Sequence, residues 1–248
     1  MKALILAAGL GTRLKPWTLS HPKALALVGG KPLLRLTIEY LQAAGIYDVI
    51  VNVHHFSDQV IWALEKNKGW GSRFEISDES DLLMDTGGAI MKAAGYGYFK
   101  NSQDFLIVNA DVLTDLSLQE LISIHKSSGQ LATLAVSERS SSRRLLFDQP
   151  TGLLAGWENM TTGERKITRQ VNSMQPMAFS GIHCLQTSII EHLAKVTEFD
   201  TRAPFSVIDG YLLLSKTCPI GYFDHTGARF MDTGTPERLA AAAAVFAS

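Results

Sequence analysis

Apolar runs of strand length alternate with segments of helical periodicity through the first 136 residues, and this alternation limits the possible folds more than any other feature of the sequence. In the segment 32–44, for example, Leu34, Ile38 and Leu41 recur at a spacing that places them on one helix face. Such alternation predicts an α/β protein with a doubly wound, mostly parallel, Rossmann-like sheet and helices on both faces. The predicted strands are 3–6, 48–53, 73–77, 105–108 and 131–136, and the predicted helices are 32–44, 58–66, 88–96 and 118–128.

The pattern changes between residues 137 and 172. Dipeptides typical of turns occur at 149–150, 151–152 and 162–163 and separate short runs, which predicts an added β-hairpin edge on the sheet. Helical patterns return at 188–196, 206–214 and 236–246, and Thr235 and Pro236 fit the N-cap and first position of the last helix. Since no linker, repeat or low-complexity tract interrupts the chain, we expect a single domain over residues 1–248.

The composition limits the classes of partner. The chain has 23 basic and 24 acidic residues, so it lacks the basic excess with which proteins hold a nucleic acid backbone. No apolar run has the length of a membrane span, and the apolar N-terminus lacks the basic flank of a signal peptide. We interpret Cys184 and Cys218 as buried free thiols in a reducing compartment. We therefore expect a cytoplasmic protein with neither a nucleic acid nor a membrane as partner.

The first predicted strand leads into LILAAGLGTRLKPWT (4–18), an exit rich in small residues and basic in character. The run Ala7, Ala8, Gly9 and Gly11 lets the backbone approach a ligand closely, and N–H groups in such a run can form a nest for an anion. Arg13 adds a planar fork of donors for phosphate oxygens. The pattern indicates a loop that wraps the phosphates of a nucleotide.

Two other phosphate-binding loops fit this segment less well. The dinucleotide fingerprint GxGxxG/A needs a small residue where this chain has Leu14. The P-loop needs serine or threonine after its lysine, but here Pro32 follows Lys31. Neither motif therefore accounts for the loop.

The longer segment AAGLGTRLKPWTLSHPKALALVGGKPL (7–33) resembles the signature of the sugar-1-phosphate nucleotidyltransferases, a GxGTRLxPxT loop followed by PKxLxxVxGKP. Three later segments are similar to family motifs in the same order: DTGGA (85–89), VNADV (108–112) and FMDTGTPERL (230–239). The resemblance covers nearly the whole chain and implies a sheet of the nucleotide-diphospho-sugar transferase type. It also implies a reaction in which an NTP and a sugar 1-phosphate give an NDP-sugar and pyrophosphate.

The resemblance also implies roles for individual residues. Asp111 and Asp232 would hold Mg²⁺, Arg13 would bind the β- and γ-phosphates, and Lys23 would bind the α-phosphate and the incoming phosphate. A simpler interpretation of each aspartate is a residue that makes a turn at a strand end. Gly181 would leave space for the sugar, although it also fits a close-packing glycine in a strand. The expected nucleotide-binding residues are Leu6, Ala7, Ala8, Gly9, Gly11, Thr12, Arg13, Lys23, Glu79, Gly87, Gly88 and Asn109.

The choice of base and sugar stays open in the sequence. The carboxylate of Glu79 can accept hydrogen bonds from the edge of guanine, or it can only orient a loop, and Asn52 ends a strand facing the same region. The E-K-P element of larger relatives, which contacts the sugar and its phosphate, is absent. The cation for the sugar phosphate is then unknown among Arg139, Arg143 and Arg144, which also fit a solvated loop.

The compact form without E-K-P looks most like N-acetylmuramate-1-phosphate uridylyltransferases and short mannose- or heptose-1-phosphate guanylyltransferases. UTP or GTP is therefore the expected nucleotide, and a monomer or small homo-oligomer is the expected state. Two alternatives remain: a nucleotidyltransferase whose acceptor is phosphocholine or a molybdenum cofactor, and an inactive regulatory subunit that binds nucleotide sugars. Retention of Arg13, Lys23, Asp111 and Asp232 argues against the inactive form.

Overall fold

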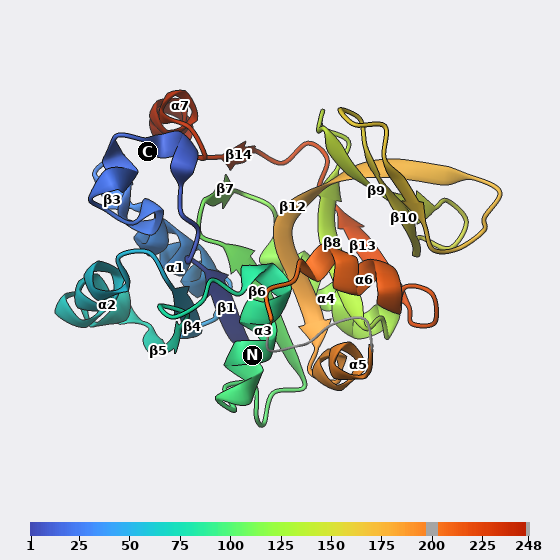
Figure 1. Cartoon of the computed structure of the whole chain (residues 1–248), viewed down its shortest axis with the longest axis horizontal. Coiled ribbons are helices and arrows are strands. Elements are labelled where there is room, and N and C mark those ends of the chain that lie inside the picture. The colour runs from blue at the N-terminus through green and yellow to red at the C-terminus, as the bar shows by residue number, and fades with distance from the viewer. Residues whose placement is uncertain (197–202, 247–248) are drawn as a thin grey trace.

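The computed structural model describes residues 1–196 and 203–246, and in this part of the chain a ten-stranded sheet forms the centre of the molecule (Figure 1). The strands follow the order β11-β10-β9-β12-β6-β1-β4-β5, and β8 lies between β12 and β13. These strands are β1 (Lys2–Leu6), β4 (Asp48–Val53), β5 (Arg73–Asp78), β6 (Asp104–Asn109), β8 (Ala132–Ser137), β9 (Arg143–Asp148), β10 (Leu154–Asn159), β11 (Arg165–Ile167), β12 (Met174–Gln186) and β13 (Ile220–Asp224).

The predicted mostly parallel sheet is confirmed in its central strands. β5, β4, β1 and β6 are parallel neighbours. Successive side chains of a strand point to opposite faces, so Ala3 and Ile5 enter one apolar cluster while Leu4 enters another. Strands buried on both faces have continuous apolar sequences, which explains why the sequence predicts them.

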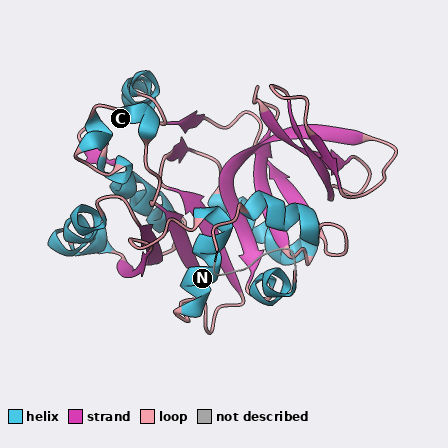
Figure 2. Ribbon diagram, viewed as in Figure 1, coloured by secondary structure: helices cyan, strands magenta, loops and turns pink. Residues whose placement is uncertain are grey.

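Helices cover both faces of the sheet, as predicted (Figure 2). α1, α2 and α4 pack with Ala3 and Ile5, while α3, α5 and α6 pack with Leu4. In residues 1–196 and 203–246 no helix combines the length and the apolar character that crossing a bilayer requires. The helices are α1 (Leu33–Ala43), α2 (Ser57–Lys66), α3 (Asp85–Gly95), α4 (Leu118–Ser128), α5 (Ile189–Lys195), α6 (Val207–Leu214) and α7 (Pro236–Phe246).

The added β-hairpin edge is also confirmed. β9, β10 and β11 are antiparallel neighbours, and the long strand β12 joins them to the rest of the sheet by running antiparallel to β9, β6 and β8. The register of β12 against β8 shifts between Phe179 and His183. Pro176 and Gly181 interrupt the apolar pattern of β12, so its full length does not follow from the sequence.

Some short elements do not follow from the sequence pattern. Two strand pairs lie outside the main sheet, β2 (Leu27–Val28) with β3 (Lys31–Pro32), and β7 (Val112–Thr114) with β14 (Phe230–Asp232). Strands of two or three residues show no measurable periodicity. α3 begins at Asp85, before the predicted start at residue 88, although Gly87 and Gly88 are weak helix formers. Gly87 is nevertheless required there, because a Cβ atom would lie 2.3 Å from the ring of Phe205.

Candidate active site

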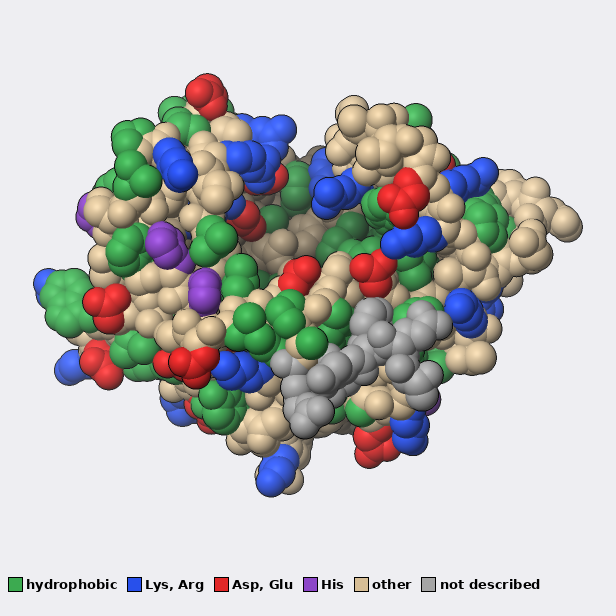
Figure 3. All heavy atoms as spheres, viewed as in Figure 1, with side chains coloured by type: hydrophobic (Ala, Val, Ile, Leu, Met, Phe, Trp, Pro, Cys, Tyr) green, Lys and Arg blue, Asp and Glu red, His purple; other side chains and the backbone are tan. Residues whose placement is uncertain are grey.

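A cavity of about 550 Å³ opens where β1, β4 and β6 end. Parallel α/β sheets collect their ligands at this edge. In Figure 3 the molecule is hollowed between the part that carries α1 and α7 and the part that carries the edge strands. The lining residues are Leu6, Ala7, Ala8, Gly9, Gly11, Thr12, Arg13, Lys23, Ala24, Asn52, Glu79, Leu83, Asp85, Thr86, Asn109, Ala110, Asp111, Pro204 and Gly234.

Ala7 and Ala8 line the cavity, but their amides point to Asn52. Both N–H groups donate to Asn52 Oδ1, at 2.6 Å from Ala7 and 3.2 Å from Ala8. The prediction that these two amides form part of an anion nest is therefore wrong. Asn52 sits at the end of β4, beside the end of β1, so the parallel register carries its side chain to the start of the loop.

The next residues of the loop leave their amides open to a ligand. In the described part of the chain, the N–H groups of Gly9, Leu10 and Gly11 donate no hydrogen bond within the protein. Gly11 has φ 60°, and a Cβ atom there would lie 2.9 Å from both Lys23 Cβ and Thr18 Cγ2. A Cβ atom at Gly9 would meet nothing within 4 Å, so packing within the described chain does not explain a glycine at this position.

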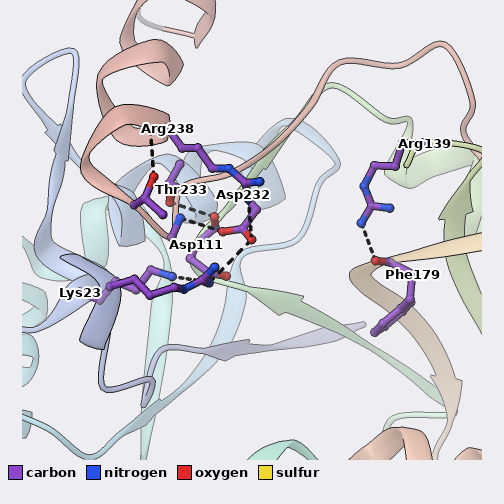
Figure 4. A network of polar contacts seen from close by, with 10 residues as sticks. Lys23, Asp111, Arg139, Phe179, Asp232, Thr233 and Arg238 are labelled. Atoms are coloured by element: carbon purple, nitrogen blue, oxygen red, sulfur yellow. Dashed lines mark hydrogen bonds and ion pairs between the residues drawn. The ribbon is translucent and has the colours of Figure 1, made fainter. Parts of the chain in front are cut away.

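A cluster of charged side chains lies beside the loop (Figure 4). Lys23, which is buried, donates from Nζ to Asp111 Oδ2. Asp232 Oδ2 lies 3.9 Å from Arg13 Nη2 and 3.3 Å from Arg238 Nη1. All four residues implied as catalytic by the sequence motifs thus belong to one network with Arg238.

The short β7–β14 pair brings the two aspartates together. Asp232 lies opposite Val112, the residue after Asp111. Next to it, Thr233 donates from both its N–H and its Oγ1 to the carbonyl oxygen of Asp111, at 2.9 Å each. Residues distant in sequence therefore meet through a ladder of only three residues.

The donor set at Asp111 and Asp232 fits a hard cation. Mg²⁺ usually takes one or two protein carboxylates and completes its shell with phosphate oxygens and water. Among the described residues no group of three or more histidine, cysteine, aspartate or glutamate side chains could hold a metal ion. The two carboxylates beside the loop after β1 therefore suit a hard cation that takes its remaining oxygen ligands from outside the protein.

The far side of the cavity is built around Glu79, whose side chain is fully buried. Its Oε1 accepts from Asn52 Nδ2 at 3.0 Å and its Oε2 from the N–H of Met84 at 3.1 Å. Burial raises the pKa of the Glu79 carboxyl, against the lowering effect of these two hydrogen bonds. Asp85 and Thr86 line the same side, and the sequence reasoning included them only as part of a motif.

Three predicted glycines lie outside the cavity lining. Gly87 and Gly88 are buried in α3, where both N–H groups donate to the carbonyl of Phe205, at 2.9 and 3.4 Å. Gly181 lies in β12 with φ 72°, and a Cβ atom there would come within 2.5 Å of Asn109 Nδ2. Gly181 thus makes room for Asn109, which does line the cavity.

Arg139 is a cation whose position the sequence left undecided. Its Nη2 donates to the carbonyl of Phe179 at 2.7 Å, and its guanidinium lies 4.2 Å from the ring centroid of Phe230. Nη1 is buried without a hydrogen-bond partner in the described chain. Burial lowers the pKa of this guanidinium, and the charge of Asp232 acts in the opposite direction. In Figure 4, Arg139 stands across from Asp232 and Lys23.

The other two arginines of this region are differently placed. Arg144 Nη2 forms an ion pair with Glu158 Oε1 at 2.7 Å, and Arg143 is exposed on β9. Sequence reasoning did not single out Arg238, although it stands in the same quoted motif as Asp232. Arg238 follows Asp232 by six residues, a short loop and the first turn of α7. This short separation could have identified Arg238 as a neighbour of the carboxylate.

Comparison with known proteins identifies the family. The model of the nucleotidyl transferase family matches residues 2–145. Mannose-1-phosphate guanyltransferases from Emericella nidulans and Aspergillus oryzae are 30% and 29% identical over 243 and 241 residues. These alignments cover 96% of this chain, which spans 62% of the length of each relative.

A solved structure shares both fold and sequence. HddC from Yersinia pseudotuberculosis, complexed with GMP-PN, is 26% identical, with a TM-score of 0.73 over 99% of both chains. The family model covers more than half of this chain and includes the loop, Lys23 and Asp111. The chain belongs to the nucleotidyl transferase family and is similar to its sugar-1-phosphate members, as its motifs predict.

Proposed function

We propose that this chain transfers a guanylyl group from GTP to a sugar 1-phosphate, giving a GDP-sugar and pyrophosphate. The observation that carries the proposal is the cavity edge, where loop amides without partners in the described chain meet the cations Arg13 and Lys23 and the carboxylates of Asp111 and Asp232. GTP is favoured over UTP because the similar proteins include mannose-1-phosphate guanyltransferases and a structure with GMP-PN.

The reaction needs positioning and charge neutralisation more than proton transfer. An oxygen of the sugar phosphate attacks the α-phosphorus, and the bond from that phosphorus to the bridging oxygen breaks as pyrophosphate leaves. The sugar phosphate is already an anion, so no general base is required. Lys23 would stabilise charge at the α-phosphate, and Arg13, whose side chain is 61% exposed, would bind the leaving phosphates.

We propose Mg²⁺ as the metal, held by Asp111 and Asp232. Bound there, it would neutralise phosphate charge and orient the phosphate oxygens. The ion pairs of these carboxylates with Lys23, Arg13 and Arg238 support the assignment, because they hold both carboxylates at the cavity edge before a nucleotide arrives.

Arg139 is the proposed cation for the sugar phosphate, in place of the missing E-K-P element. Its buried Nη1 has no hydrogen-bond partner in the described chain, and an unpaired donor on a buried charged group is costly. A phosphate supplies such a partner with two acceptor oxygens in a planar geometry. Arg144, by contrast, already pairs with Glu158.

The proposal is tested by measuring pyrophosphate release with Mg²⁺ over a grid of GTP, UTP, CTP, dTTP and ATP against several sugar 1-phosphates. The sugars are mannose, glucose, N-acetylglucosamine, N-acetylmuramate and heptose. The expected result is release in a GTP row, with mannose or heptose as acceptor. Release only in a UTP row would contradict the choice of base, and release with no pair would contradict the proposed reaction.

A further inference from the structure

We infer that Asn52 and Glu79 act as a positioning pair that holds the phosphate-binding loop in register with the base-side wall of the cavity. The inference rests on the proposed function and adds two residues to it. Neither residue needs to touch a phosphate. Together they form a buried chain of hydrogen bonds from α3 to the loop after β1.

The orientation of the Asn52 amide is fixed by its neighbours. Its Oδ1 faces two donors, the N–H groups of Ala7 and Ala8, so its Nδ2 must face an acceptor. That acceptor is Glu79 Oε1 at 3.0 Å. A flipped amide would set donors against donors on one side and oxygen against oxygen on the other. Only one arrangement of Asn52 therefore satisfies all its partners.

The Glu79 carboxylate, which orients the Asn52 amide, is itself fixed by hydrogen bonds. Its second oxygen accepts from Met84 N–H at the start of α3, at 3.1 Å. Its backbone N–H donates to the carbonyl of Val53 at 2.8 Å, and its own carbonyl lies 2.7 Å from His54 Nδ1. The carboxylate is therefore a fixed point between the base-side wall and Asn52.

This arrangement determines where the free amides of the loop point. Asn52 takes the N–H groups of Ala7 and Ala8, and the following amides of Gly9 to Gly11 are left without partners in the described chain. Loss of the Asn52 acceptor would leave two buried N–H groups unpaired, and the loop would move to satisfy them. The amides that meet the phosphates would then shift relative to the base-side wall.

Two exchanges of amide and carboxylate test the pair. In Glu79→Gln the side chain faces two donors, Asn52 Nδ2 and the Met84 N–H, but has only one oxygen. In either orientation its NH₂ group therefore faces one of these donors. In Asn52→Asp, two carboxylates face each other. In the double variant N52D/E79Q, the carboxylate introduced at position 52 accepts from both alanine amides and from the NH₂ group introduced at position 79. The oxygen of that new amide accepts from Met84. The double variant therefore restores every hydrogen bond with the net charge of the original pair.

The readouts are the Kd of inorganic tripolyphosphate, which has no base to contact Glu79, and the KM and kcat for GTP. We expect each single variant to weaken tripolyphosphate binding and raise the KM for GTP about tenfold. We expect the double variant to recover both values to within about threefold of the wild type. Asn159→Asp, on the edge hairpin, is the matched control for an added charge and should leave both values unchanged.

The direction of the Glu79→Gln effect separates positioning from simple electrostatics. Removal of a negative charge from the cavity wall would strengthen anion binding if charge alone mattered, whereas the positioning pair predicts weaker binding. Single variants with wild-type affinity, or a double variant no better than the worse single one, would overturn the inference. If a single variant fails to fold, the double variant decides, because the pair predicts that it folds and binds; an unfolded double variant would overturn the inference.

Failure of the inference is distinguishable from failure of the proposed function. Wild-type protein that binds tripolyphosphate but releases no pyrophosphate from any substrate pair would contradict the proposed reaction, and the exchange test would still decide the positioning role. Active wild-type protein whose single variants keep their affinity would contradict only the positioning role. Wild-type protein that neither binds tripolyphosphate nor turns over would contradict both.

Discussion

Gly9 and Gly11 lie in the same loop, but the surroundings of the two positions differ. At Gly11 the chain itself excludes a side chain, because φ is 60° and a Cβ atom would lie 2.9 Å from Lys23 and Thr18. At Gly9 a Cβ atom would meet nothing within 4 Å. Gly9 lines the cavity, so we attribute this glycine to the proposed nucleotide rather than to packing within the protein.

Gly9→Ala is therefore expected to impair binding without loss of stability. The free energy of unfolding should stay the same or rise by up to about 1 kcal/mol, while the KM for GTP rises because a methyl group occupies the approach of the phosphates. Gly95→Ala is the matched control, since a Cβ atom there also meets nothing within 4 Å. Steady-state kinetics and urea denaturation measure both quantities. An unchanged KM for GTP in Gly9→Ala would contradict this account of the loop.

Arg139→Gln should raise the KM for the sugar phosphate about tenfold or more and leave the KM for GTP nearly unchanged. The reason is that Arg139 stands apart from the charged cluster of Lys23, Asp111 and Asp232, beside Phe179 (Figure 4). Arg143→Gln, at an exposed position on β9, is the control and should change neither value. Initial rates measured with each substrate varied in turn make the comparison. A rise confined to the KM for GTP would contradict the assignment.

At the residue scale, the sequence predicts the charged groups well and their partners poorly. Lys23, Asp111 and Asp232 are predictable because each stands in a short motif beside a strand or loop. The hydrogen bonds of Asn52 to the amides after β1 could not be predicted, because they depend on the register between β1 and β4. The sequence pattern predicts an anion nest from Ala7 onward, whereas Gly9 is the first residue of the loop whose amide has no hydrogen-bond partner in the described chain.

At the scale of elements, the irregular strand β12 contacts two residues of this region, Asn109 and Arg139. Gly181 sits where the register against β8 shifts, and its missing Cβ leaves room for Asn109 at the end of β6. The strand also carries Phe179, whose carbonyl accepts from Arg139. A regular strand would lose both arrangements.

Gly181→Ala should lower the free energy of unfolding by about 1–3 kcal/mol, because a non-glycine residue is strained at positive φ and its Cβ would clash with Asn109. Gly163 has a similar φ of 75° but open space around it. Gly163→Ala therefore isolates the backbone term and should cost less. Urea denaturation of both variants gives the difference. An equal loss of unfolding free energy in the two variants would show that the contact with Asn109 does not contribute to the effect.

The sequence predicts long elements better than short ones. The longer helices and the central strands follow from periodicity and apolar runs, and α4 has the predicted bounds Leu118–Ser128. The β7–β14 pair does not, because three-residue strands have no pattern and owe their existence to pairing across the chain. That pair nevertheless brings Asp232 close to Asp111. The arrangement of the two carboxylates therefore depends on strands that the sequence does not predict.

At the scale of the whole molecule, buried histidines link stability to pH. Complete burial lowers the pKa of His183 to about 3, while the same group in the unfolded chain titrates near its ordinary value of 6.5. Burial also lowers the pKa of His125 and His225. The unfolded chain therefore binds more protons than the folded one below pH 6.5. The stabilisation from neutral His183 is complete above that value and is lost as the pH falls toward 3.

His183→Gln should reduce this dependence on pH. Between pH 6 and 4 His183 contributes a slope of up to about 1.4 kcal/mol per pH unit to the free energy of unfolding, and the variant should lack this contribution. Urea denaturation at several pH values measures the slopes of the two proteins. Identical slopes would contradict the neutral state of His183 in the folded protein.

The architecture as a whole is the part that the sequence predicts best. Alternating strands and helices leave few ways to build a sheet with both faces covered, and the carboxyl edge of that sheet is where ligands collect. The edge hairpins were predicted, but the path of β12 and its pairing with β9 could not be, because antiparallel pairing between distant strands leaves no local signal.

Guanylyl transfer is tested most directly by ³¹P NMR of GTP and mannose 1-phosphate with Mg²⁺ and either the wild-type chain or Lys23→Ala. GDP-mannose and pyrophosphate should accumulate in equal amounts with the wild type, and about a hundredfold more slowly with the variant. Accumulation of GDP and inorganic phosphate, or equal rates for the two proteins, would contradict it.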